Sequence, residues 1–122
     1  MYTILSSITE LSKTVTIQHY FALTRARADL LKAHDMDAAE WAMLESVALA
    51  DADGQQLCVT ELMRMREHGS PATVHRRLVT LRKKGFVLVT PDQTDSRVKW
   101  LGLSPTARGI FTRLAEVIDP QA

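Results

Sequence analysis

The sequence predicts a mainly α-helical fold with one small β-hairpin, an α+β fold, built as a single domain over residues 1–122. Three observations support this prediction. Apolar residues recur at helical spacing through most of the chain. Two short runs rich in β-branched and aromatic residues, 86–90 and 98–103, have the composition of strands. A chain of 122 residues is the size of one domain with a modest core.

Residues 1–33 are predicted to form a long helical region. Its apolar stripe is made by Ile4, Leu5, Ile8, Leu11 and Val15 and continues, after a phase shift, with Ile17, Tyr20, Phe21, Thr24, Ala28 and Leu31. The β-branched run 14–17 disfavours helix and predicts a kink or break there. The stripe is longer than a small core needs, so we expect this region to pack against a second copy in a homodimer. Wrapping around the chain's own core is the alternative.

The next helix is predicted over residues 38–50. Asp37 and Glu40 have the spacing of a capping box, in which each side chain bonds the other residue's backbone N–H. Asp and Gly at 51–54 favour a turn that ends the helix. Its inward-facing residues are expected to be Trp41, Leu44, Val47 and Ala48.

Residues 57–69 are predicted to contain two short elements and a turn. The apolar run 57–59 is interpreted as a minor edge strand. Thr60 is then expected to cap a brief helix over 61–66. His68 and Gly69 are predicted to form a tight turn before the next helix.

Residues 70–85, SPATVHRRLVTLRKKG, have clear signals for a helix at both ends. Ser70 followed by Pro71 is a typical helix start, and Gly85 is a typical stop. One face is apolar, through Val74, Leu78 and Leu81. The segment holds five Lys or Arg residues and no Asp or Glu. Such a helix is suited to lie against a polyanion.

Residues 57–103 together have the pattern of a winged helix-turn-helix. Two helices joined by a short turn with a glycine form the helix-turn-helix. The polar, turn-rich run 91–97 between the two strands is too long for a two-residue hairpin, so it predicts a projecting loop, the wing. Ser104 and Pro105 repeat the cap-then-proline start and open a C-terminal helix over 104–118.

The charge of the chain is uneven. Its net charge is +1, but residues 1–56 hold four Lys or Arg against eight Asp or Glu, and residues 57–100 hold nine against four. A near-neutral chain that concentrates positive charge in one third indicates a local anionic partner. A solvated basic surface is the alternative reading of the charge alone.

Double-stranded DNA is the partner that the placement of these charges favours. A helix that enters the major groove needs short or forked polar side chains toward its N-terminal half. Helix 71–84 supplies such side chains, and Thr80 and Lys83 further along are placed to meet phosphates. The predicted contacts from this segment are Ser70, Ala72, Thr73, His75, Arg76, Arg77, Thr80 and Lys83.

The wing, residues 90–99, adds three predicted contacts. Asp95 and Arg97 project to the same side if the chain is extended, so Asp95 can hold Arg97 by a charge-assisted hydrogen bond. A pre-aimed Arg suits the negative potential of a narrow minor groove. Lys99 lies on the same side and is placed to take a phosphate.

These segments resemble those of a known family. The matching residues in the helix and its exit are Thr73, Val74, Arg76, Leu78, Leu81 and the run Lys83-Lys84-Gly85-Phe86-Val87. Asp95-Ser96-Arg97 matches the Asp-x-Arg of that family's wing, and residues 34–44 resemble the opening of its second helix. On these residues the chain resembles the MarR family of winged-helix transcriptional regulators over roughly residues 13–118.

The resemblance implies a sequence-specific DNA-binding regulator, with repression expected rather than activation. Two copies of helix 71–84 would enter successive major grooves, and the wings would reach the minor grooves. The chain departs from the family at Arg77, commonly apolar there, and at Ala107, where the family has Gly. It also ends at Ala122, before the family's final dimerisation helix. We expect residues 1–12 to substitute for that helix.

A small-molecule or redox sensor is a second reading, since many members of this family are sensors. Candidate pocket residues are His19, Tyr20 and Trp41, with His34 nearby, although aromatic residues at helical spacing are more often core or interface. Cys58 has no Lys, Arg or His next to it in sequence, so we interpret it as a buried structural thiol. The effector, if there is one, stays unidentified.

A third reading, an enzyme or a protein-binding module on the same scaffold, finds less support. The four His residues lack metal-ligand spacing, and no phosphate loop, nucleophile elbow or paired carboxylates occur, so no cofactor and no catalysis are expected. A protein-interaction module would bind in a salt-resistant way, unlike a DNA-binding domain. The single Cys and the lack of a signal or membrane-spanning run predict a cytoplasmic protein without membrane contact.

Overall fold

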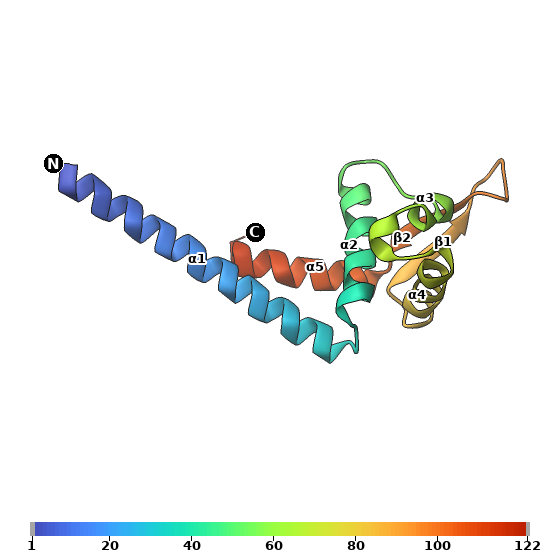
Figure 1. Ribbon diagram of the computed structural model, residues 1–122, viewed down its shortest axis with the longest axis horizontal. Coiled ribbons are helices and arrows are strands. Elements are labelled where there is room, and N and C mark those ends of the chain that lie inside the picture. The colour runs from blue at the N-terminus through green and yellow to red at the C-terminus, as the bar shows by residue number, and fades with distance from the viewer. Residues whose placement is uncertain (1, 122) are drawn as a thin grey trace.

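The computed structural model describes residues 2–121, with side chains from Lys13 onward. The predicted mainly helical fold with one β-hairpin is confirmed (Figure 1). The elements in chain order are α1 (Tyr2–Ala33), α2 (Ala38–Ala52), α3 (Val59–Met63), the 3₁₀ helix η1 (Arg66–His68), α4 (Pro71–Lys83), β1 (Val87–Pro91), β2 (Lys99–Leu103) and α5 (Pro105–Ile118). Helix α1 projects far beyond the rest, α5 runs beside it, and α3, α4 and the hairpin lie at the opposite end.

Helix α1 is continuous over 32 residues, so the predicted kink or break at residues 14–17 is wrong. A β-branched residue costs a helix only a few tenths of a kcal/mol, which continuous hydrogen bonding outweighs in a long helix. In this chain Val15, Ile17, Tyr20 and Phe21 are about half exposed or more, between 49% and 62%. Among the described side chains of α1, those that pack on the core come from its C-terminal half and are partly buried, such as Leu23 and Leu30.

Helix α2 begins with the predicted capping box. Glu40 N donates to Asp37 Oδ1 at 2.7 Å, and Asp37 N donates to Glu40 Oε1 at 3.1 Å. The helix ends at Ala52, two residues later than predicted, and Gly54 follows with a φ of 73°. This left-handed backbone conformation costs little free energy at a glycine, which has no Cβ, and it ends the helix.

The predictions for residues 57–66 differ from the structure in three details. Residues 57–59 do not form a strand, although they pair with β2 at one point: Cys58 makes an isolated bridge with Trp100, and Leu101 N donates to Leu57 O at 2.8 Å. Helix α3 covers Val59–Met63 instead of 61–66, so it ends earlier than predicted, and Thr60 lies inside the helix with Cys58 preceding it. The N–H of Cys58, the N-cap residue, donates to Glu61 Oε1 at 3.2 Å, so the side chain of Glu61 inside the helix bonds the backbone at the cap.

The hairpin is antiparallel, with Val87 opposite Leu103 and Pro91 opposite Lys99. Both strands begin one residue later than predicted. Phe86 N donates to Leu81 O at 3.0 Å and so belongs to the turn that follows α4, and Val98 N donates to Asp95 O at 3.0 Å and so belongs to the wing loop. Residues 92–98 form the wing loop, which projects from the body of the molecule (Figure 1).

The core lies between α2, α4, the hairpin and α5. Its fully buried large side chains are Met43, Leu44, Val47, Leu62, Val74, Leu81, Val87 and Leu101. Helix α5 is capped by Ser104, whose Oγ accepts from Ala107 N at 3.1 Å, and it buries Ile110 and Leu114. Over the described residues, no helix has both the length and the apolar character that crossing a bilayer requires.

Candidate nucleic-acid interface

Helix α4 is held by its apolar face and presents its basic face to solvent. Val74, Leu78 and Leu81 are at most 5% exposed, and their positions at i, i+4 and i+7 fix the rotation of the helix. Ser70 caps the helix as predicted, with its Oγ accepting from Thr73 N at 3.3 Å. The opposite face is therefore directed away from the core.

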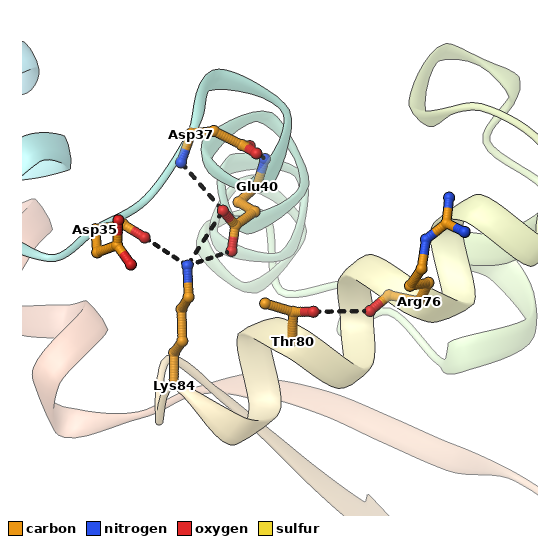
Figure 2. Close-up of polar contacts among 6 residues, drawn as sticks. All are labelled: Asp35, Asp37, Glu40, Arg76, Thr80 and Lys84. Carbon is orange, nitrogen blue, oxygen red and sulfur yellow. Dashed lines mark hydrogen bonds and ion pairs between the residues drawn. The ribbon is translucent and has the colours of Figure 1, made fainter.

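The predicted contacts on α4 fall into two groups. Ala72, His75, Arg76 and Lys83 are exposed and free of the core. Both threonines use their hydroxyls within the helix: Ser70 Oγ donates to Thr73 Oγ1 at 3.0 Å, and Thr80 Oγ1 donates to the Arg76 carbonyl at 3.1 Å (Figure 2).

Arg77 is held by the turn that precedes the helix. Its Nη1 donates to the carbonyl oxygen of His68 at 2.8 Å. His68 is only 7% exposed, and its Nε2 lies 2.8 Å from Ser46 Oγ of α2. A Cβ added to Gly69 would lie 3.3 Å from Thr73 Cγ2, and Gly69 has a φ of 107°, so the turn requires glycine. These contacts fix the start of α4 relative to α2.

The wing is organised by Asp92, which the sequence reasoning missed. Its Oδ1 accepts from the Trp100 indole Nε1 at 2.9 Å, and its Oδ2 accepts from Thr94 Oγ1 and from the N–H groups of Thr94 and Asp95. An Asp two residues before a Thr in a turn-rich run is a signal for such a loop. The partnership with Trp100, across the hairpin, has no signal in the sequence.

The predicted pair Asp95 and Arg97 is present at the tip of the wing. Arg97 Nε lies 3.0 Å from Asp95 Oδ1, and Arg97 Nη2 lies 3.2 Å from Oδ2, which is the bidentate geometry of strong ion pairs. The Arg97 side chain is 89% exposed. Its guanidinium is therefore held in one direction while facing solvent. Lys99, at the start of β2, is also exposed.

A cavity of about 350 Å³ connects the helix with the hairpin. His75 of α4 and Lys99 of β2, two predicted contacts, line it together with Arg82. Arg82 is exposed and basic like its neighbours in α4, although it is not among the contacts that the sequence predicts. The structure thus brings the helix and the wing base into one basic surface.

Acidification is expected to loosen the wing. The Trp100 indole, then the Thr94 and Asp95 donors, hold the pKa of Asp92 below its usual range, and Arg97 lowers the pKa of Asp95. Asp92 and Asp95 bind protons more readily in the unfolded chain than in the folded protein. Their contribution to the stability of the wing is therefore fully present above about pH 4 and is lost as the pH falls through the lower pKa values of the folded protein. We expect the indole N–H resonance of Trp100 to titrate only below about pH 4.

The indole of Trp41 is an internal control for that titration. Trp41 is 6% exposed, and its Nε1 has no hydrogen-bond acceptor among the described residues. Its resonance should stay constant while that of Trp100 moves. Movement of the Trp100 resonance with a midpoint above about pH 4, or its titration unchanged in Asp92→Asn, would contradict the proposed role of Asp92.

The residues suggested for a ligand pocket lie in different environments. His19 and Tyr20 are exposed on α1, and the Tyr20 ring lies 5.9 Å from that of Phe21. Trp41 is in the core, stacked on Phe111 of α5 with 5.1 Å between ring centroids. Cys58 is half-buried rather than fully buried, because it lies at the edge of the hairpin. No cluster of three or more His, Cys, Asp or Glu suited to a metal occurs among the described residues.

The arrangement of helix, turn and wing defines a winged-helix fold, and comparison with known proteins agrees. No protein-family model and no curated sequence matches the chain. Among solved structures, the S. aureus MepR–DNA complex superposes with a TM-score of 0.65 at 19% identity, over 86% of this chain and 74% of the MepR chain. The transcriptional regulator Tm0710 from Thermotoga maritima gives 0.66 at 15% identity, over 92% and 75%.

A mutant of MarR from E. coli, solved in complex with operator DNA, gives a TM-score of 0.59 at 19% identity, over 98% of this chain and 79% of the MarR chain. These similarities concern the fold, since every identity lies below 20%. The chain has the winged-helix fold of the MarR-type regulators, as the resemblance of its sequence motifs implied.

Proposed function

We propose that this chain is a MarR-type transcriptional regulator that binds double-stranded DNA as a homodimer and acts in the cytoplasm as a repressor. The exposed basic face of α4, beside a wing that holds Arg97 in a fixed direction, is the observation that carries the proposal. Two of the three superposed structures, MepR and MarR, were solved with DNA. Helix α4 enters the major groove, and the wing lies on the minor groove.

The residues of this proposed interface are those predicted from the sequence. From α4 and its cap they are Ser70, Ala72, Thr73, His75, Arg76, Arg77, Thr80 and Lys83; from the wing they are Asp95, Arg97 and Lys99. Arg77 acts through its bond to the His68 carbonyl, which leaves its remaining N–H groups for DNA. Asp95 acts by holding Arg97.

Selection of bound DNA from a random pool, at two salt concentrations, tests this function. A palindromic consensus with half-sites about 34–36 Å apart, bound more weakly at high salt, is the expected result. Repression follows if this operator overlaps a promoter. Binding of a protein partner that resists high salt, with no DNA selected, would instead favour an interaction module.

The exposed apolar face of α1 is proposed to hold the two copies together. Ile17 is 52% exposed and Phe21 49%, and they lie one turn apart on the same side of the helix. Residues 1–12, expected to contribute to this contact, have side chains outside the described part of the chain. Two such large apolar residues on a projecting helix are typical of an interface.

The double variant Ile17→Asp with Phe21→Asp is therefore expected to be a monomer at micromolar concentration in analytical ultracentrifugation. An unpaired carboxylate is costly to bury, so two of them in an apolar interface oppose dimerisation. Its affinity for a palindromic operator should fall with dimerisation. Leu49→Asp, at a 64% exposed position of α2, is the matched control and should leave the dimer intact. A double variant that remains dimeric would rule out this face.

A further inference from the structure

Lys84, the C-cap residue directly after α4, points back toward the start of α2. Its Nζ donates to Glu40 Oε2 at 3.0 Å and Oε1 at 3.3 Å, and also to the carbonyl oxygen of Asp35. Figure 2 shows these contacts converging on one ammonium group. They join the end of α4 to the start of α2 and to the turn between α1 and α2.

Glu40 needs this partner. The residue is only 6% exposed, and an ionised carboxylate at that depth is costly unless it is paired and hydrogen-bonded. Its two oxygens are taken by Lys84 and by the Asp37 N–H of the capping box. Lys84 is 27% exposed at its side chain, and the hydrogen bond to Glu40 raises its pKa, so it stays charged at neutral pH.

The turn that Lys84 reaches is closed by a backbone hydrogen bond and anchored in the core. Met36 N donates to Leu31 O at 2.9 Å, and Asp35 takes a left-handed φ of 51°, which together close the end of α1. Met36 is 6% exposed and anchors the turn in the core. His34 adds a second link to the far end of α4, with its ring edge-on to Phe86 and 5.6 Å between centroids. The turn that follows α1 and the residues that follow α4 are thus joined at two places.

We propose that the Lys84–Glu40 pair sets the half-site spacing that the protein accepts. This inference rests on the proposed dimeric DNA binding. In such a dimer α1 holds the partner and α4 reads DNA, so the angle between these helices fixes how far apart the two reading helices lie. The Lys84–Glu40 pair and the Asp35 carbonyl hold that angle. Without them, α4 gains freedom to follow half-sites at other spacings.

Two adjacent lysines provide the test. Lys83 is exposed and makes no ion pair among the described residues. Lys83→Met and Lys84→Met remove the same charge one position apart. Affinities are measured for the selected operator and for operators lengthened or shortened by one base pair at the centre, over a series of salt concentrations.

Lys83→Met should weaken all operators alike and flatten the salt dependence, as loss of one phosphate contact does. Lys84→Met should keep the salt slope of the wild type. Its discrimination between operator lengths, which is the ratio of its affinity for the selected operator to that for a lengthened or shortened one, should fall about fivefold, a factor common for coupled sites. A loss of folded protein would reduce the apparent affinity for every operator equally. A change in discrimination therefore reports how Lys84 holds α4 relative to α1. Lys84→Arg, which keeps the charge, should restore most of the discrimination.

A Lys84→Met variant that flattens the salt slope would show a phosphate contact and overturn the proposal. Unchanged discrimination between operator lengths would overturn it as well. If Lys84→Met does not fold, Glu40→Gln takes its place, because it removes the ion pair while leaving no buried charge, and it should lower discrimination in the same way. Wild-type protein that binds no DNA would refute the proposed function and this role with it.

Discussion

Leu81→Ala is expected to lower the free energy of unfolding by about 2–5 kcal/mol, as such substitutions do at closely packed positions. Leu81 has no exposed surface and lies where α4 turns toward the hairpin. Its carbonyl accepts from Phe86 N at 3.0 Å, so the side chain and the backbone of this residue both support the exit from α4. The cavity left by the substitution would be lined by core side chains that have little room to collapse.

Urea unfolding of the purified protein measures this loss. Leu49→Ala is the control, because Leu49 is 64% exposed and its truncation should change the free energy by less than about 0.5 kcal/mol. A loss below about 1 kcal/mol in Leu81→Ala would mean that α4 is not held by this face. The DNA affinity of the folded fraction should also decrease, since the same residue fixes the rotation of the helix.

The features that the sequence predicted correctly are local. Ser70 and Ser104 each accept a hydrogen bond from an N–H three residues ahead, and Asp37 and Glu40 form their capping box within one turn. Val74 and Leu78 are buried because helical spacing places them on one face. Neighbours within four residues decide all of these features, so their pattern is visible in the linear sequence.

Where prediction failed, partners distant in sequence decided the outcome. In the sequence Lys84 is one of five cations in segment 70–85, yet its partner Glu40 lies 44 residues away. Asp92 was read as part of a polar loop, although Trp100 across the hairpin makes it the centre of the wing. Short apolar runs such as 57–59 fit a strand or a helix start equally well, and both uses occur here: Cys58 makes a bridge with Trp100 of β2, and Val59 opens α3.

The proposed interface is thus only partly visible from sequence. Residue types and helical spacing indicate which side of α4 faces away from the core and would meet DNA in the proposed complex. They do not indicate which of its cations are already engaged within the protein, as Arg77 and Lys84 are. Arg76 is exposed on the N-terminal half of the helix, and Figure 2 shows that its side chain takes no part in the Lys84 contacts. This position makes it the residue most suited to read a base.

Arg76→Ala is therefore expected to weaken binding to the selected operator by about 1–3 kcal/mol, or about 5- to 150-fold, and to relax preference at one base pair of each half-site. An Arg that forks onto a guanine loses both affinity and discrimination when truncated, whereas one on a phosphate loses affinity alike for all sequences. Arg108→Ala is the matched control: it removes the same charge from α5, where Arg108 pairs with Asp51 at 3.6 Å. Dissociation constants for the operator and its single-base variants at one salt concentration separate these cases. Equal losses on every variant would assign Arg76 to a phosphate, and no loss would remove α4 from the interface.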